Sequence, residues 1–323
     1  MRPETAVAVE PLLLDPDGPI VVAIGGGHGQ AAALEAIQCY AGEISALVSV
    51  ADDGGSSGRL SDLGMPPPGD VRRCLLALTP DPSLWSELFA HRFRGGDVAE
   101  HSLGNLILAA LTDLFGDFES AVATAERMLG TLGSVIPVAD HPVVLEAIID
   151  GQLVVGQERI SKTAGELTEL RIQPSDVVAT RRALAAIAVA DQIVIGPGSL
   201  YTSIISAFKV NMLAPAVMSA DAQKIFVLNL VTQDGETLGM DGLAHLEAMA
   251  THAGMTGPGI VVVHGGILDV PEGHDQVTLD VAEAASQGWR VVVADVAGEW
   301  SDWPTHDPMK LGRVLEELAN TEI

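Results

Sequence analysis

The sequence predicts an α/β protein with a mostly parallel sheet between two layers of helices, a Rossmann-like three-layer α/β/α fold. Two observations lead to this fold class. Short runs of β-branched apolar residues recur along the chain, and glycine-rich or polar turns separate them from helical stretches. One segment, about 135–171, departs from this alternation and is expected to form a small β-rich insertion.

The first α/β unit consists of a strand over 20–24, a helix over about 30–40 and a second strand over 45–50. Further helices are expected from residue 71 onward and over about 83–93, 104–115 and 118–132. Within the insertion, two apolar runs flank Asp150-Gly151, a pair typical of two-residue β-hairpin turns. The alternation of strands and helices then resumes. Helices are expected at about 176–190, from about residue 200, and at about 241–253 and 308–319. Strands are expected at 192–195, 225–230, 260–264 and 290–296.

Composition limits the classes of function. The 323 residues include 17 Lys and Arg against 43 Asp and Glu, a net charge of −26. A surface this acidic repels phosphate backbones and anionic lipid, so we expect no nucleic-acid binding. The longest unbroken apolar stretch, 183–190, is too short to span a bilayer, so we expect no membrane insertion.

The chain is expected to form one domain over residues 20–323, preceded by a flexible arm over 1–19 that is rich in proline and acid. The start of the chain lacks the basic-then-apolar layout of a signal peptide. The only two cysteines, Cys39 and Cys74, suit a reducing compartment. We therefore expect a cytoplasmic protein.

Three glycine-rich loops each follow a predicted buried strand, and in a parallel sheet they gather at one edge, where ligands bind. In the first, Gly26, Gly27 and His28 precede a helix, whose N-terminus favours phosphate. The spacing Gly27-x-Gly29-x-x-Ala32 also fits the dinucleotide fingerprint loosely, which leaves a nicotinamide dehydrogenase as one alternative. A plain strand-to-helix turn is another.

The second loop begins with Asp52 and Asp53 and continues through Ser56 to Arg59. An acid after the second strand binds a ribose hydroxyl in Rossmann folds. Two adjacent carboxylates are also suited to holding a Mg²⁺ ion that bridges phosphates, so both aspartates are candidate metal ligands. The alternative is a solvated turn, because aspartate and glycine favour turns.

The third loop contains Gly196, Gly198 and Ser199, and its hydroxyls stand at a predicted helix start, where they bind an anion or cap the helix. Thr232 follows a later strand and opens a fourth candidate loop at the same edge. Basic residues are scarce, so the arginines at 59, 72 and 73 suggest an anion subsite, with local ion pairing as the alternative.

The sequence lacks the motifs of several common enzyme classes. It contains neither the Gly-x4-Gly-Lys-Ser/Thr loop of P-loop nucleotide hydrolases nor a Gly-x-Ser-x-Gly elbow. Neither cysteine has an evident histidine partner, so thiol catalysis is not expected.

Several segments, taken in order, resemble the YvcK-type gluconeogenesis factor family, which is related to the 2-phospho-L-lactate transferases. The matching stretches are VAIGGGHG (22–29), VADDGGSSGRL (50–60), PPGDVRRC (67–74), HSLGNL (101–106), ADQIVIGPGSLYTS (190–203) and NLVTQDGETL (229–238). Two positions depart from the family's pattern: His28 stands where threonine is usual, and Arg73 where asparagine is usual.

The resemblance implies a cytoplasmic regulator that binds a UDP-sugar, notably UDP-N-acetylglucosamine, and supports cell shape and cell-wall synthesis during gluconeogenic growth. It further implies cell-wall synthesis proteins and a Ser/Thr kinase as partners, and we expect a homo-oligomer. Carried onto this chain, Gly26 and Gly27 would approach the diphosphate, and Asn105 would face the nucleotide. Gly198 and Ser199 would border the ligand from the opposite side, and Asn229 is a further candidate. The alternative is a metal-dependent transferase of the phospholactate type.

Overall fold

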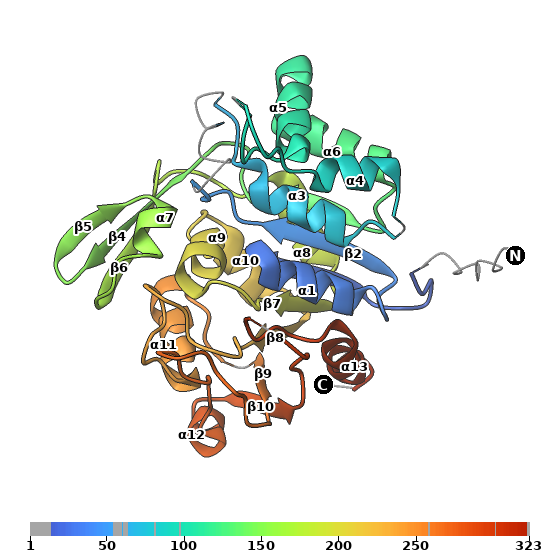
Figure 1. The fold of residues 1–323 in the computed structure, drawn as a ribbon. Coiled ribbons are helices and arrows are strands. Elements are labelled where there is room, and N and C mark those ends of the chain that lie inside the picture. Colours follow the sequence, from blue (N-terminus) through green and yellow to red (C-terminus); the bar gives the residue numbers. More distant parts are fainter. Residues whose placement is uncertain are drawn as a thin grey trace, which may run out of the picture.

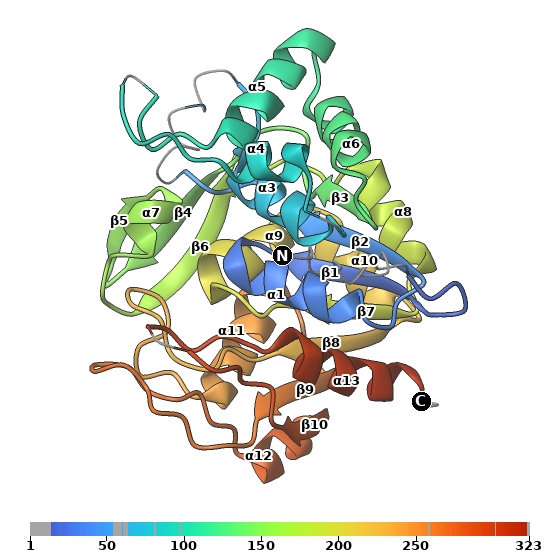
Figure 2. The same ribbon diagram turned by 45° about the vertical axis from the view of Figure 1, so that its right-hand side comes forward.

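The computed structural model describes residues 14–53, 60, 64–80, 82–96, 98–257, 259–300 and 302–321. Its centre is a sheet of seven parallel strands in the order β10-β9-β8-β7-β1-β2-β3 (Figures 1 and 2). The strands are β1 (Ile20–Gly25), β2 (Glu43–Val48), β3 (Ser134–Pro137), β7 (Gln192–Ile195), β8 (Gln223–Val227), β9 (Gly259–His264) and β10 (Trp289–Ala294). Along the chain the sheet grows from β1 toward β3 and then, from β7, in the opposite direction. This is the doubly wound order of Rossmann folds, and it confirms the predicted fold class.

The strands are apolar throughout because both faces of the sheet are covered. In β1, Val22 and Ile24 belong to one core, whereas Val21 and Ala23 belong to the other, and all four side chains are buried. Such near-continuous apolar runs distinguish a buried parallel strand from a half-exposed antiparallel one.

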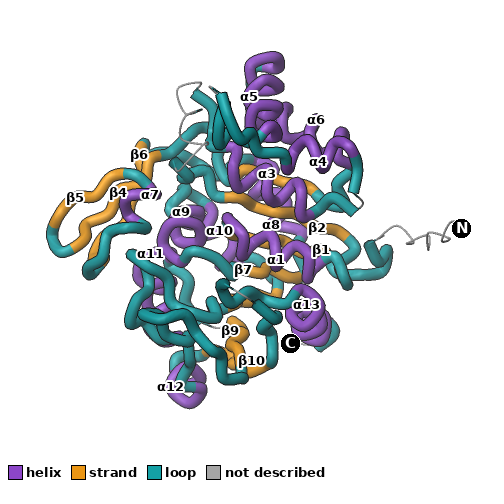
Figure 3. Tube along the Cα trace, in the orientation of Figure 1, coloured by secondary structure: helices purple, strands orange, loops and turns teal. Residues whose placement is uncertain are grey.

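Helices form the two outer layers (Figures 2 and 3). Six contribute to the core on one side of the sheet: α1 (Gly27–Ile37), α3 (Pro68–Ala77), α4 (Leu84–Ala90), α5 (Leu103–Phe115), α6 (Phe118–Leu129) and α13 (Pro308–Ala319). Those on the other side are α8 (Arg181–Val189), η2 (Leu200–Ile205, a π-helical turn), α9 (Ser206–Phe208), α10 (Leu213–Ser219), α11 (Gly242–Ala253) and α12 (Val281–Ser286). N-cap side chains fix where several of these helices begin, such as Asp117 before α6 and Asp241 before α11.

A small antiparallel sheet stands apart from the central one, with strand order β5-β4-β6. Its strands are β4 (Val144–Ile149), β5 (Gln152–Val155) and β6 (Leu167–Gln173), and α7 (Gln157–Ile160) packs on it. Asp150 (φ 48°) and Gly151 (φ 74°) form the expected two-residue turn. The segment Ser134–Pro137, expected in part to belong to the insertion, is instead the edge strand β3. A short apolar run does not itself indicate which sheet it joins.

The start of one helix also differs from the expectation. The helix expected from about 176 begins at Arg181, because Thr180 accepts a hydrogen bond from the backbone N–H of Ala183 and caps it. Residues 1–13 of the expected arm lie outside the described residues, whereas Asp15 donates its backbone N–H to Ala41. Within the described part of the chain, no helix is long and apolar enough to span a membrane.

Candidate functional site

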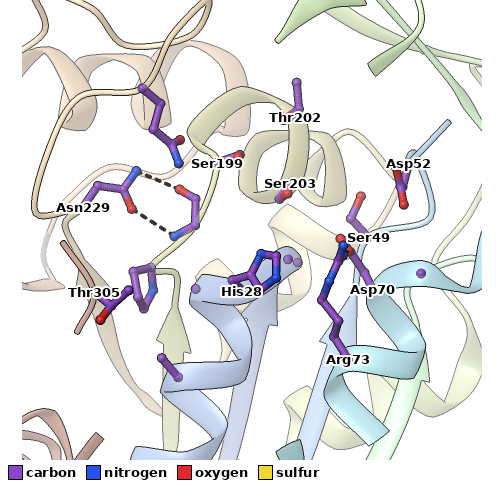
Figure 4. Close-up of a pocket in the computed structure, with 18 of the residues that line it drawn as sticks. His28, Ser49, Asp52, Asp70, Arg73, Ser199, Thr202, Ser203, Asn229 and Thr305 are labelled. Carbon is purple, nitrogen blue, oxygen red and sulfur yellow. Dashed lines mark hydrogen bonds and ion pairs between the residues drawn. The ribbon is translucent and has the colours of Figure 1, made fainter. Parts of the chain in front are cut away.

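A cavity of about 780 Å³ opens where β1 and β7 separate the two halves of the sheet (Figure 4). The loops after β1, β2, β7 and β8 border it, together with the start of α3 and residues 303–306. Sites of nucleotide-binding α/β proteins lie at this topological switch point. Besides Arg72 and Arg73, eight candidate residues line the cavity: Gly26, Gly27, His28, Asp52, Asn105, Gly198, Ser199 and Asn229.

The first glycine loop leads directly into α1 and leaves the start of that helix open. Gly26 is the N-cap, no side-chain cap is formed by the residues that the structure describes here, and the first turn of α1 contains no acid. Gly27 has φ 68°, which favours glycine. A Cβ on Gly29 would collide with the carbonyl oxygen of Pro197, so this glycine lets α1 approach the third loop. The first N–H groups of α1 therefore form a partial positive charge at the cavity.

Arginine side chains stand at the same end of the cavity. Arg72, Arg73 and Arg92 all line it, and Arg72 is buried, with its Nε donating to Asn105 Oδ1 at 3.0 Å. Burial, Arg73 and Arg92 lower the pKa of Arg72 to about 10, so this guanidinium remains charged at neutral pH. In a chain with a net charge of −26, this is a local concentration of positive charge.

His28 projects from the first turn of α1 between two groups of side chains. Figure 4 shows Arg73 and Asp70 on one side of it and Asn229 and Thr305 on the other. Burial, followed by Arg73, lowers the pKa of this imidazole below its usual value. His28 is therefore mainly neutral at pH 7 and able to donate one hydrogen bond into the cavity.

The two adjacent aspartates of the second loop do not point to the same place. Asp52 lines the cavity, whereas Asp53 Oδ1 accepts the backbone N–H of Glu158 at 2.8 Å, at the start of α7. No cluster of three or more His, Cys, Asp or Glu side chains able to hold a metal ion occurs within the described ranges. The two carboxylates thus face different surroundings in this structure, and a Mg²⁺ site shared by Asp52 and Asp53 stays a prediction. Ser56 and Arg59 lie outside the described residues.

The third loop is held by a residue from the fourth. Asn229 pairs its side-chain amide with the backbone of Gly198, whose φ is 152°. Gly196 does not line the cavity; its φ of 73° instead allows the turn that leads from β7 toward it. Asn229 thus holds the wall of the cavity through its amide and also lines the cavity, and its direct contact with a ligand stays a prediction.

The helix that follows this loop differs from α1 because a half-buried carboxylate occupies its start. Glu236 accepts the backbone N–H groups of Tyr201 at 3.0 Å and Thr202 at 3.3 Å, and also the Thr202 hydroxyl. Burial raises the pKa of Glu236, and these hydrogen bonds oppose the shift. Because Glu236 already accepts these N–H groups at the start of η2, they are not free to bind an anionic ligand. The N–H groups at the start of α1 are therefore the better site for an anion.

Thr232 is the remaining candidate, and it lies behind the wall. It is fully buried, and its hydroxyl accepts the backbone N–H of Asp275 at 2.9 Å. Its neighbours Leu230, Val231 and Gln233 line the cavity instead.

Sequence reasoning missed one wall of the cavity. Trp303, Pro304, Thr305 and His306 line it from the segment before α13. They follow no glycine-rich loop, so the pattern of loops after strands did not mark them. In the structure, this segment is marked by Trp303, a large apolar residue that is 38% exposed. Other lining residues that the sequence did not single out are Ser49, Arg92 and Gln157.

Comparison with known proteins supports the resemblance drawn from the motifs. The sequence profile of the family described as 2-phospho-L-lactate transferase CofD matches residues 21–297. A putative gluconeogenesis factor of Mycobacterium tuberculosis is 40% identical over 319 residues, which cover 94% of this chain and 91% of that protein. The gluconeogenesis factor of Bacillus subtilis is 36% identical over 312 residues, covering 93% and 98% respectively.

The fold is similar to solved structures over nearly the whole chain. A crystal structure of a Bacillus halodurans protein superposes with a TM-score of 0.89 at 35% identity and covers 93% of this chain and 99% of that one. A second structure, described as a UPF0052 family member of that species, has a TM-score of 0.87 at 36% identity and covers 91% and 98%. The cavity wall at 303–306 lies beyond the segment matched by the transferase profile.

Proposed function

The chain belongs to the CofD family, among its gluconeogenesis factors, and on that premise we propose that it binds a UDP-sugar, UDP-N-acetylglucosamine, as a regulator. The bound form would support cell shape and cell-wall synthesis during gluconeogenic growth, in the cytoplasm. Its partners would be cell-wall synthesis proteins and a Ser/Thr kinase, and the protein would act as a homo-oligomer.

One observation carries the proposal: the open N-terminus of α1 and three arginines meet at one end of the cavity. Helix N-termini and guanidinium groups are the donors that phosphate groups favour in proteins. The neighbouring helix start, that of η2, is already occupied by the Glu236 carboxylate. The diphosphate of a nucleotide sugar is therefore expected at α1.

The rest of the cavity suits the other parts of such a ligand. Its volume of about 780 Å³ lies in the range of ligand pockets, roughly 300–1,000 Å³. Away from the arginines, it is bordered by Gln233, Trp303 and Thr305, which offer an amide, an aromatic ring and a hydroxyl. A base and a sugar need groups of these kinds for stacking and hydrogen bonding.

Thermal unfolding with a series of ligands tests the proposal. UDP-N-acetylglucosamine, UDP-glucose, GDP and NAD are each added with and without Mg²⁺ at fixed pH. A ligand at about 100 times its Kd adds roughly 2.7 kcal/mol, which shifts the Tm by several degrees. We expect a shift with the UDP-sugars, no consumption of the UDP-sugar on long incubation, and a smaller shift in Arg72→Gln.

Other outcomes would change the assignment. A shift confined to GDP with Mg²⁺ would favour the phospholactate transferase, for which the family profile over 21–297 is the supporting observation. That alternative requires product from guanylyl-phospholactate and a deazaflavin acceptor. A shift with NAD alone would favour a dehydrogenase. No shift with any UDP-sugar would contradict the proposed function.

A further inference from the structure

A carboxylate lies directly beside the glycine loop that is proposed to hold the phosphates. Asp70 is in the first turn of α3, and its side chain is only 8% exposed. A Cβ added to Gly26 would stand 2.5 Å from Asp70 Oδ2, so the two residues are in close contact. An anion at α1 would be repelled by this carboxylate, because water screens charges poorly in a cavity.

Arg73 neutralises this carboxylate from within the chain. Its Nη1 forms an ion pair with Asp70 Oδ1, and both residues line the cavity. Many proteins instead place a divalent cation between carboxylates and the phosphates of a nucleotide. Here the two aspartates suited to that task by sequence diverge, because Asp53 is bound at the start of α7.

We propose that the Arg73 guanidinium takes the place of a divalent cation beside Asp70, so that this chain binds the phosphates of its ligand without Mg²⁺. The inference rests on the proposed function, since it concerns the phosphate end of the same cavity. His28 lines the cavity at the same end, beside Arg73 and Asp70.

A purely structural role for the pair is the competing explanation. Acid–base pairs three residues apart stabilise helices, and Asp70 also suits the first turn of α3. The pair Lys162–Glu158, four residues apart, is an ordinary surface ion pair, with side chains 71% and 49% exposed. The side chains of Arg73 and Asp70 are 29% and 8% exposed and face a cavity, so their charges also act on whatever it binds.

The first experiment measures the affinity for UDP-N-acetylglucosamine by calorimetry, once in EDTA and once in excess Mg²⁺. We expect the wild type to bind equally in both. Arg73→Gln should bind about tenfold or more weakly in EDTA and regain affinity in Mg²⁺. Arg73→Lys, which retains the charge, should remain independent of Mg²⁺.

Arg127→Gln is the matched control, because Arg127 is an exposed arginine of α6 that bonds Thr124. It removes one positive charge without touching the cavity and should behave as the wild type. Binding by the wild type only in Mg²⁺, or full binding by Arg73→Gln in EDTA, would overturn the proposal. Either result would leave the pair with its structural role alone.

A second experiment needs no nucleotide and uses Mn²⁺ alone as the probe. Electron paramagnetic resonance measures how much Mn²⁺ the protein removes from solution. We expect Arg73→Gln to bind Mn²⁺ more tightly than the wild type, and the added Asp70→Asn change to abolish the gain. Equal uptake by the wild type and Arg73→Gln would overturn the proposal. If the wild type binds no UDP-sugar in either buffer, only the proposed function fails, and Mn²⁺ uptake still decides the role of Arg73.

Discussion

The side-chain amide of Asn229 forms two hydrogen bonds with the backbone of Gly198. Asn229 Oδ1 accepts the N–H of Gly198 at 3.0 Å, and Asn229 Nδ2 donates to its carbonyl oxygen at 2.8 Å. The two residues come from the loops after β8 and β7, so the pair joins neighbouring walls of the cavity. It also holds Gly198 at φ 152°, a conformation that side chains rarely adopt.

Asn229→Ala is therefore expected to weaken ligand binding without unfolding the protein. Two backbone groups lose their partners, which costs about 1–3 kcal/mol of folding free energy where water does not replace them. Urea unfolding and calorimetry with UDP-N-acetylglucosamine measure the two effects. Asn211→Ala is the control, because Asn211 bonds the Ser175 carbonyl outside the cavity. Equal affinity in both variants would contradict a positioning role for Asn229.

Any side chain at Gly26 is expected to lower the free energy of unfolding, because it would collide with Asp70. A Cβ there would lie 2.5 Å from Asp70 Oδ2 and 3.1 Å from Ser203 Cβ, and such overpacking costs about 1–3 kcal/mol. In a double-mutant cycle, Gly26→Ala should cost less when Asp70→Ala has already removed the nearest atom. A Cβ on Gly27 meets no atom within 4 Å, so Gly27→Ala should cost only the strain of φ 68°, about 1 kcal/mol.

Urea unfolding of the single and double variants measures both costs. The Gly27→Ala and Asp70→Ala effects should add, whereas those of Gly26→Ala and Asp70→Ala should not. Additivity in both cycles would show that Asp70 does not press against the glycine loop.

Removal of the Glu236 carboxylate is expected to destabilise the start of η2. Glu236→Ala leaves the N–H groups of Tyr201 and Thr202 without their acceptor, which costs about 1–3 kcal/mol at this half-buried site. Glu236→Gln keeps one carbonyl oxygen as an acceptor and should cost less. Thermal and urea unfolding distinguish the two variants. Equal losses would indicate that packing, rather than the hydrogen bonds, is the contribution of Glu236.

Stability is expected to fall as the pH drops from about 6.5 to 4. His306 is buried and donates through Nε2 to the Leu228 carbonyl oxygen at 3.2 Å. Burial lowers its pKa from 6.5 to about 4, so in this range the unfolded chain binds a proton that the folded chain does not. The stability from this histidine is complete above its unfolded pKa, and up to about 3 kcal/mol is lost by pH 4.

The measurement is urea unfolding at pH 7.5 and pH 5.0. Burial also lowers the pKa values of His28, His245, His252 and His264, which act in the same direction. The raised pKa of Glu236 acts in the opposite direction, because its folded form takes up a proton first as the pH falls. His306→Gln should reduce the difference between the two pH values, whereas His141→Gln, at an exposed position, should not. An unchanged difference in His306→Gln would contradict this account.

The amino-acid sequence by itself determined the fold class and the edge of the sheet where the cavity lies. Apolar runs closed by glycine-rich loops are local signals, and parallel strands bring the loops at their carboxyl ends to one edge. Gly26, Gly27, Asp52 and Gly198 were predictable as site residues for this reason.

Only the tertiary structure decided which neighbouring side chains share a function. Asp52 and Asp53 are adjacent in sequence, yet one faces the cavity and the other caps α7. Glu236 occupies the start of one helix while α1 stays open, and residues 303–306 form a wall that no loop pattern marked. The physical reason is that a side chain's partners come from segments distant in sequence, and local propensity carries no information about them.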